Sequence, residues 1–263
     1  MRAFLSMTML LGLVLTGAAE AGDDDAAAIL KAVHLRDRGS DLVWDIALDL
    51  IDRNGNVRQR TSRIFRRELD GGRSEQVTVF LSPANIRHTA LLDIASEDGE
   101  DYMWLYLPAL KLTRRIPPTA RGDKFVGTDF TMEDVDLGFE HRDYVGAVLQ
   151  RIQEDGHPVA VLRIEPKTAE LKRDLGYDYT ITKVRTDQAI FIEQRFFRGG
   201  REIRRNAFRD IRTIDGILTP MDLRAEDLVN RHRTVLRVRE ARYNAGVPDV
   251  YFRKEALARE IYR

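Results

Sequence analysis

The segment from residue 102 to residue 134 carries the side chains best suited to hold a ligand. Its first part, Tyr102 to Leu107, alternates as a β-strand and is apolar on both faces, with aromatic rings on one side and methionine and leucine on the other. Two apolar faces need two apolar partners. Either protein layers cover both faces, with the following insertion as one of them, or the strand lines a cavity for acyl chains.

Two adjacent arginines follow this strand, Arg114 and Arg115. A guanidinium group pairs well with a phosphate or carboxylate, so these residues are candidates for contact with a lipid head group. The alternative is a pair of exposed arginines on a strand, and their spacing alone favours this second interpretation.

Residues that commonly carry catalysis show no recognisable pattern. The sequence contains no G-x-S-x-G, P-loop or G-x-G-x-x-G motif. Carboxylates are abundant, but most alternate along strands or lie in turns, so they do not indicate a glycosidase-type pair. The acidic loop 97–101 lacks the spacing of an EF-hand, which favours a solvated turn over a calcium site. We therefore predict that the protein is not an enzyme.

Metal and thiol chemistry are also not indicated. The chain has no cysteine, which excludes disulfides, thiolate nucleophiles and a lipid-modified N-terminal cysteine. No two histidines follow each other at the spacing of metal ligands. The sequence thus predicts neither a metal nor a cofactor. The five histidines are His34, His88, His141, His157 and His232.

The charges are balanced, with 42 basic and 42 acidic residues. A nucleic-acid-binding protein needs a basic excess for its phosphate contacts, so nucleic acid is not an expected partner. Charged residues make up 32% of the chain, above the usual quarter. The surface is expected to be well solvated, with its apolar groups concentrated in one region.

The first 21 residues have the order of a cleavable signal peptide. Arg2 precedes an apolar run from Ala3 to Leu15, and Ala19 and Ala21 offer small residues before a polar Asp-rich segment. The alternative is a membrane anchor, but the run is shorter than the roughly 20 residues that span a bilayer. We expect an exported, soluble, non-lipidated periplasmic protein in which residues 22–263 form a single domain.

Hydrophobic periodicity predicts a helix over residues 22–38 and then a long series of strands. From Leu42 to Leu50 apolar residues alternate with aspartates, and Asn54-Gly55 indicates a hairpin turn. Similar alternation and turns continue to Tyr243, interrupted by an insertion from about Pro117 to Arg142 and a short helix near 168–174. A helix is expected at 249–261. The predicted fold is mainly β with α: an unclosed antiparallel barrel of about 11 strands, with helices covering its concave face.

Several short motifs resemble the outer-membrane lipoprotein-sorting protein family, which includes LolA-like periplasmic carriers. They are Leu81-Ser82-Pro83, the run from Trp104 to Leu110, Arg114-Arg115-Ile116, the run from Phe125 to Phe130, Glu133-Asp134, and Val250-Tyr251-Phe252. Val126 and Thr128 are conservative departures from the family pattern. The resemblance covers roughly residues 75–260.

This resemblance implies an unclosed barrel that holds a lipid or an acylated lipoprotein chain in its hydrophobic interior, for transfer towards the outer membrane. It also implies a possible inner-membrane partner, an exporter of the resistance-nodulation-division type. The expected head-group or motif residues are Arg114, Arg115 and Asp129. The expected cavity wall consists of Leu42, Trp44, Ile46, Leu48, Trp104, Tyr106, Leu107, Phe125 and Phe130.

A second hypothesis is a non-catalytic periplasmic adaptor that docks onto a membrane exporter. Its candidate contact is the arginine-rich segment from Arg58 to Arg67. The alternative for this segment is a solvated outer face of the sheet. A filled interior would favour the adaptor, whereas an apolar cavity would favour the carrier.

Overall fold

The computed structural model describes residues 23–69, 73–95, 101–135, 140–259, 261 and 262. The predicted signal peptide, residues 1–21, lies outside the described residues, as does most of the acidic loop 97–101. Among the helices that are described, none has the length and apolar character needed to cross a membrane.

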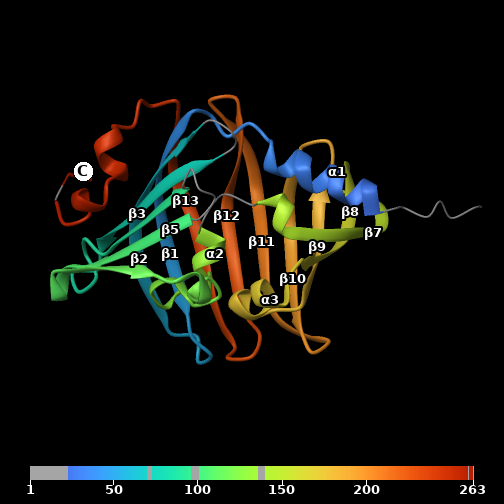
Figure 1. Cartoon of the computed structure of the whole chain (residues 1–263), viewed down its shortest axis with the longest axis horizontal. Coiled ribbons are helices and arrows are strands. Elements are labelled where there is room, and N and C mark those ends of the chain that lie inside the picture. The colour runs from blue at the N-terminus through green and yellow to red at the C-terminus, as the bar shows by residue number, and fades with distance from the viewer. Residues whose placement is uncertain (1–22, 70–72, 96–100, 136–139, 260, 263) are drawn as a thin grey trace, which may run out of the picture.

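A single antiparallel sheet of 13 strands forms the body of the molecule (Figure 1). It runs in the order β6-β5-β4-β3-β2-β1-β13-β12-β11-β10-β9-β8-β7, and its edge strands β6 and β7 do not pair. The predicted unclosed barrel is confirmed, with 13 strands instead of about 11 because every alternating segment joins the same sheet. The strands are β1 (Asp41–Ile51), β2 (Val57–Glu68), β3 (Ser74–Ser82), β4 (Ala90–Ala95), β5 (Asp101–Leu107), β6 (Leu112–Ile116), β7 (Tyr144–Glu154), β8 (His157–Pro166), β9 (Tyr179–Arg185), β10 (Ile190–Arg198), β11 (Arg201–Ile214), β12 (Ile217–Asp227) and β13 (His232–Tyr243).

The order of the strands follows from short hairpins. β1 lies in the middle, and the chain runs outward from it through β2 to the edge strand β6. It then crosses to the opposite edge, β7, and returns strand by strand to β13, which pairs with β1. The crossing segment is residues 117–143, which we call the insertion. It contains the helix α2 (Met132–Val135) and the 3-10 helices η3 (Pro118–Ala120), η4 (Phe125–Gly127) and η5 (His141–Asp143).

The alternation along β1 defines the two faces of the sheet. Its even-numbered side chains, from Leu42 to Leu50, are buried with Phe130 of the insertion, so this is the covered concave face. Helix α1 (Asp23–His34) packs on the same face over β7. The helix approaches β7 closely at Gly146, where a Cβ would be in van der Waals contact with Ala26. A short helix, α3 (Ala169–Leu175), is capped by Thr168 and ends at Gly176 in the left-handed conformation.

The C-terminal segment lies beside the strands on the opposite side of the molecule from α1 (Figure 1). The helix expected at 249–261 is wrong: the segment forms two 3-10 helices, η6 (Asp249–Phe252) and η7 (Lys254–Ala256). Phe252 and Leu257 pack with Phe65 and Val77, which belong to the face away from the insertion. The packing of Phe252 and Leu257 against the sheet favours short turns over a continuous helix.

Candidate functional site

A cavity of about 190 Å³ lies between the concave face of the sheet and the segments that cover it. Its floor is formed by β1, β2 and β7 to β13, and its cover by the end of α1, the loop to β1, the insertion with α2, and the end of α3. The wall is predominantly apolar and includes Leu42, Phe208, Ile217 and Leu223. A well-formed apolar cavity with a few polar groups is the usual form of a small-molecule site.

The structure places three of the predicted wall residues at this cavity: Leu42, Trp44 and Phe130. Ile46 and Leu48 belong to the same buried cluster but lie beyond the cavity lining. Only the start of β1 therefore borders the cavity. The later even-numbered side chains of β1 are packed directly against other side chains.

Phe125 and Leu107 lie in a neighbouring buried cluster on the concave face. There the ring of Phe125 stacks on that of Phe80, with centroids 5.5 Å apart. These two predicted wall residues thus anchor the insertion to β3 and β5 and do not border the cavity.

Trp104 and Tyr106 lie on the other face of the sheet, against the C-terminal segment. Paired residues of neighbouring strands share a face, and Trp104 pairs with Leu92, which pairs with Val77. Val77 pairs with Phe65, which pairs with Val43 of β1. Val43 lies on the face of the sheet opposite to that of Leu42. The second apolar face of β5 is therefore covered by a protein layer that the sequence did not indicate, and the placement of both rings in the cavity wall is corrected.

The two adjacent arginines lie on the edge strand β6 and are both exposed. Arg115 stacks over the ring of Tyr102, with its guanidinium carbon 4.3 Å from the ring centroid. Arg114 pairs in register with Leu105, on the concave side of the sheet but outside the cavity lining. A role in binding a head group stays a prediction for both residues, and neither of them lines the cavity described above.

Asp129 is the centre of a buried polar network. Its side chain is fully buried and accepts a hydrogen bond from Thr234 Oγ1 (2.8 Å), while its carboxylate lies 3.0 Å from Lys124 Nζ and 2.6 Å from His232 Nδ1. Lys124 Nζ also contacts Asp227, at 2.7 Å. Burial would raise the pKa of Asp227, but hydrogen bonds from Asn230 and Lys124 lower it to about 2. The network joins the insertion to β12 and β13.

A second contact holds α2 over the sheet. Thr131 and Asp134 cap each other's backbone N–H groups at the start of the helix. Asp134 also forms an ion pair with Arg204 and accepts a hydrogen bond from Asn206 Nδ2 at 2.9 Å, both from β11. One carboxylate therefore serves both as a helix cap and as the link between the insertion and the cavity floor.

Four arginines line the cavity among the described residues, and none of them belongs to the cavity or head-group residues predicted from the sequence: Arg36, Arg38, Arg66 and Arg204. Arg66 is only 1% exposed. It belongs to the arginine-rich strand that was expected to form a docking surface or a solvated face. The register carries the missed signal, because Arg66 pairs with Leu42 and therefore shares its inward-facing row.

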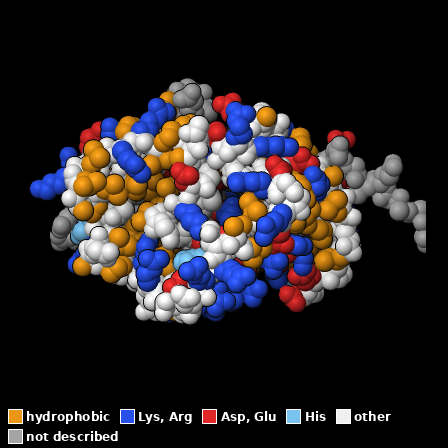
Figure 2. All heavy atoms as spheres, turned by 90° about the horizontal axis from the view of Figure 1, so that it is seen from below, with side chains coloured by type: hydrophobic (Ala, Val, Ile, Leu, Met, Phe, Trp, Pro, Cys, Tyr) orange, Lys and Arg blue, Asp and Glu red, His pale blue; other side chains and the backbone are white. Residues whose placement is uncertain are grey.

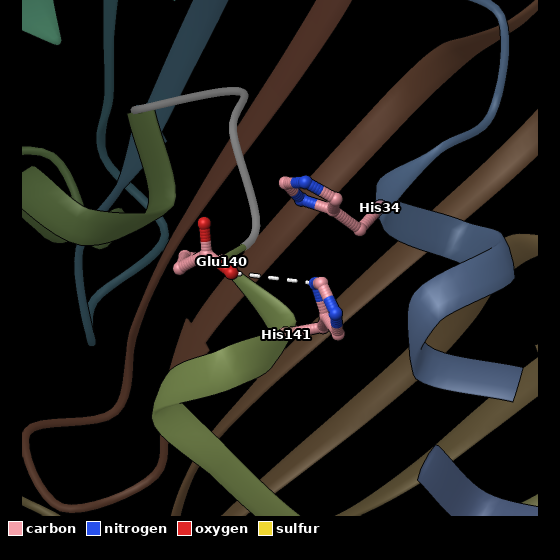
Figure 3. Close-up of side chains that lie close together, drawn as sticks. All are labelled: His34, Glu140 and His141. Atoms are coloured by element: carbon pink, nitrogen blue, oxygen red, sulfur yellow. Dashed lines mark ion pairs between the residues drawn. The ribbon is translucent and has the colours of Figure 1, made fainter. Parts of the chain in front are cut away.

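Two histidines from distant parts of the chain meet where α1 ends and the insertion returns to β7. The rings of His34 and His141 have centroids 4.6 Å apart, and His141 Nδ1 lies 3.3 Å from a carboxylate oxygen of Glu140 (Figure 3). The histidines thus lack the spacing of metal ligands along the sequence, but two of them lie close together in the folded protein. One possible ligand atom from each of His34, Glu140 and His141 lies within 4.8 Å of the others. Glu140 is also paired with Arg142, whose guanidinium contacts both carboxylate oxygens.

Lowering the pH from 7.5 to 5.5 is expected to destabilise this contact. Burial, followed by the neighbouring charge of His34, lowers the pKa of His141 below its usual value of 6.5. The unfolded chain then takes up the proton more readily, so stability is lost as the pH falls through about 6.5. Urea unfolding at pH 7.5, 6.5 and 5.5 should show a smaller loss for His141→Gln than for the wild type.

The variant His88→Asn is the control for this measurement, because asparagine tolerates the positive φ of His88. It should keep the wild-type dependence on pH. Glu140 does not interfere: hydrogen bonds from Arg142 overcome its burial and lower its pKa to about 2, so its contribution is lost only in more acidic solution. Equal slopes for His141→Gln and the wild type would contradict the assignment.

The sheet, its uncovered edges and the cavity under the insertion define a LolA-like fold. A domain from Vibrio parahaemolyticus described as an outer membrane lipoprotein-sorting protein domain has a TM-score of 0.82 and 24% identity, and the match covers 90% of this chain and all of that one. A DUF1329 family protein from Desulfovibrio piger has a TM-score of 0.79 and 25% identity, with 89% and 97% covered. A LolA superfamily protein from Nitrosomonas europaea has a TM-score of 0.67 and 17% identity, with 90% and 99% covered.

Residues 72–259 match a family model with the description "-like: Uncharacterized protein". Because the match spans more than half of the 263 residues, the chain belongs to this family. No curated protein sequence matches the chain. The structural similarity to LolA-like proteins confirms the resemblance seen in the sequence motifs.

Proposed function

We propose that this protein is a periplasmic carrier that binds a lipid, or the acyl chain of a lipoprotein, inside its half-barrel for transfer towards the outer membrane. The observation that carries the proposal is the apolar cavity between the concave face and the insertion. The LolA-like fold supports it, and so does the N-terminal segment expected to direct export. Such a carrier needs no catalytic group, because it only shields an apolar chain from water.

The size of the cavity indicates how a chain enters. At about 190 Å³ it exceeds the engineered cavity of roughly 150 Å³ that binds benzene, so it has room for part of an acyl chain. Each buried methylene contributes about 0.8 kcal/mol. A complete chain requires the cavity to widen. The contacts of Asp134 with Arg204 and Asn206, which hold α2 over the cavity floor, are polar and can exchange with water.

Purification from the periplasm without detergent tests the proposal directly. We expect native mass spectrometry to show a fraction of the mature protein carrying one lipid, released on denaturation and identified in the extract. The emptied protein should take up N-phenyl-naphthylamine, a neutral fluorescent probe, with a saturable rise in emission. A protein that is always empty and that does not take up the probe would contradict the carrier.

One surface observation favours the adaptor as a second candidate. Figure 2 shows Lys and Arg side chains gathered near the middle of the lower face, with hydrophobic side chains towards both ends. The arginine-rich strand contributes less than expected: Arg58 is exposed, whereas Arg60 donates a hydrogen bond to the Val126 carbonyl and Arg66 is buried. Docking onto an exporter of the resistance-nodulation-division type stays a prediction, and it is compatible with the carrier.

A further inference from the structure

The guanidinium of Arg66 is buried at the cavity without enough partners. Its Nε donates a hydrogen bond to Glu68, at 2.8 Å. Its Nη1 and Nη2 are both buried and have no hydrogen-bond partner among the described residues. A buried cation with unpaired N–H groups is unfavourable unless another group completes its hydrogen bonding. Since Arg66 lines the cavity, that group can come from a ligand.

A second guanidinium lies near it. Arg36, on the loop between α1 and β1, lines the same cavity and donates a hydrogen bond to the Leu218 carbonyl at 2.8 Å. Burial lowers the pKa of Arg36, and the positive charge of Arg66 acts in the same direction, while Tyr243 and the carboxylates of Asp37 and Glu68 oppose it. The two cations therefore repel each other at the same end of the cavity, and an anion placed between them would relieve that repulsion.

The carboxylate that pairs with Arg66, that of Glu68, lies outside the cavity lining. Among the described residues, the acidic members of the lining are Glu133 and Asp134. Asp134 is paired with Arg204, and Glu133 accepts a hydrogen bond from the Tyr144 hydroxyl at 3.2 Å. Both belong to the insertion, whereas Arg66 and Arg36 belong to β2 and the loop before β1. The apolar wall of Ile217 and Leu223 completes an amphipathic cavity.

We propose that Arg66, together with Arg36, binds the anionic head group of the carried lipid, a carboxylate or a phosphate, while the acyl chain lies along the apolar wall. This inference rests on the proposed carrier function and specifies its ligand as an anionic amphiphile. Guanidinium groups bind both kinds of oxyanion through paired N–H donors, and Arg66 has such donors free on Nη1 and Nη2.

Displacement of N-phenyl-naphthylamine by three competitors with the same chain length tests the inference: palmitate, monopalmitoyl lysophosphatidate and the neutral hexadecanol. The wild type should bind at least one of the two anions roughly tenfold more tightly than hexadecanol. Arg66→Gln should reduce this preference to about one without changing the affinity for hexadecanol, and Arg66→Lys should keep part of it. A preference for palmitate or for lysophosphatidate identifies the head group.

Arg63→Gln is the matched control, because Arg63 lies on the same strand and pairs with Asp45 on the opposite face. It should keep the wild-type preference. If Arg66→Gln fails to fold, Arg36→Gln provides the same test on a partly exposed residue. Equal binding of anions and hexadecanol by the wild type, or an unchanged preference in the variants, would overturn this inference and leave the carrier intact. Failure of all three competitors and of the probe would overturn the carrier itself.

Discussion

Replacing Asp129 by alanine is expected to lower the free energy of unfolding by about 1.5–3 kcal/mol, because the groups that donate hydrogen bonds to its buried carboxylate lose their acceptor. The side chain of Asp129 is fully buried, and the change leaves His232 and Thr234 without their shared acceptor. Lys124 keeps Asp227 but loses its other partner. Chemical denaturation followed by circular dichroism measures the loss.

The same substitution should also release the insertion from β13. Asp129 donates its backbone N–H to Thr234 Oγ1 at 2.9 Å, and the hydroxyl returns a hydrogen bond to the carboxylate, so the two contacts depend on each other. We expect limited proteolysis to cut the insertion of Asp129→Ala before the rest of the chain. Asp123→Ala, an exposed carboxylate in the same insertion, should change stability by less than about 0.5 kcal/mol. A loss below about 1 kcal/mol for Asp129→Ala would show that the network is not a structural anchor.

Filling the cavity should abolish most ligand binding. Leu223 lies on β12, is 6% exposed and lines the cavity. In Leu223→Trp the indole would occupy space otherwise filled by about two methylenes of a ligand, which corresponds to roughly a tenfold or greater loss of affinity. Because the new ring enters existing space, the cost in stability should stay below the usual range of about 1–3 kcal/mol for overpacking. Isothermal calorimetry with palmitate measures the change.

Leu112→Trp is the matched control, because Leu112 is exposed on the edge strand and lies outside the cavity lining. Its affinity for palmitate should equal that of the wild type. Unchanged binding by a folded Leu223→Trp variant would place the lipid elsewhere on the molecule. The comparison also separates a filled cavity from a general effect of an added aromatic ring.

The hydrophobic pattern of the sequence was sufficient to predict the sheet. It was not sufficient to predict which side chains lie under the insertion and which under the C-terminal segment. The alternation from Leu42 to Leu50 predicted a strand with one buried face, and the structure shows that face under the insertion. The sequence pattern could not show which face of the sheet carries Trp104 and the other aromatic side chains of β5. Both faces of β5 are apolar, so alternation along the strand does not distinguish them. The side is set by the register through β4 and β3 and by the C-terminal segment that packs there.

The site was also difficult to predict because it depends on contacts between residues that are far apart in the sequence. Arg66 and Arg58 look alike as members of an arginine-rich strand, but Arg66 is buried at the cavity, whereas Arg58, near the other end of β2, is exposed. His34 and His141 are far apart in sequence, and only the crossing of the insertion brings them together. The motif from Phe125 to Phe130 was identified, yet its carboxylate Asp129 anchors the fold and does not face the cavity.

The strand order has a consequence for how this chain folds. Every neighbouring pair in the sheet is consecutive along the chain except β1 and β13. The segments β1–β6 and β7–β13 can each assemble by successive hairpins, with little loss of chain entropy at any step. The seam between them joins Leu42 to Tyr243, which closes almost the entire domain into one loop. We infer that this seam forms last, so the cavity, whose lining includes both of these residues, exists only once the two meanders have docked.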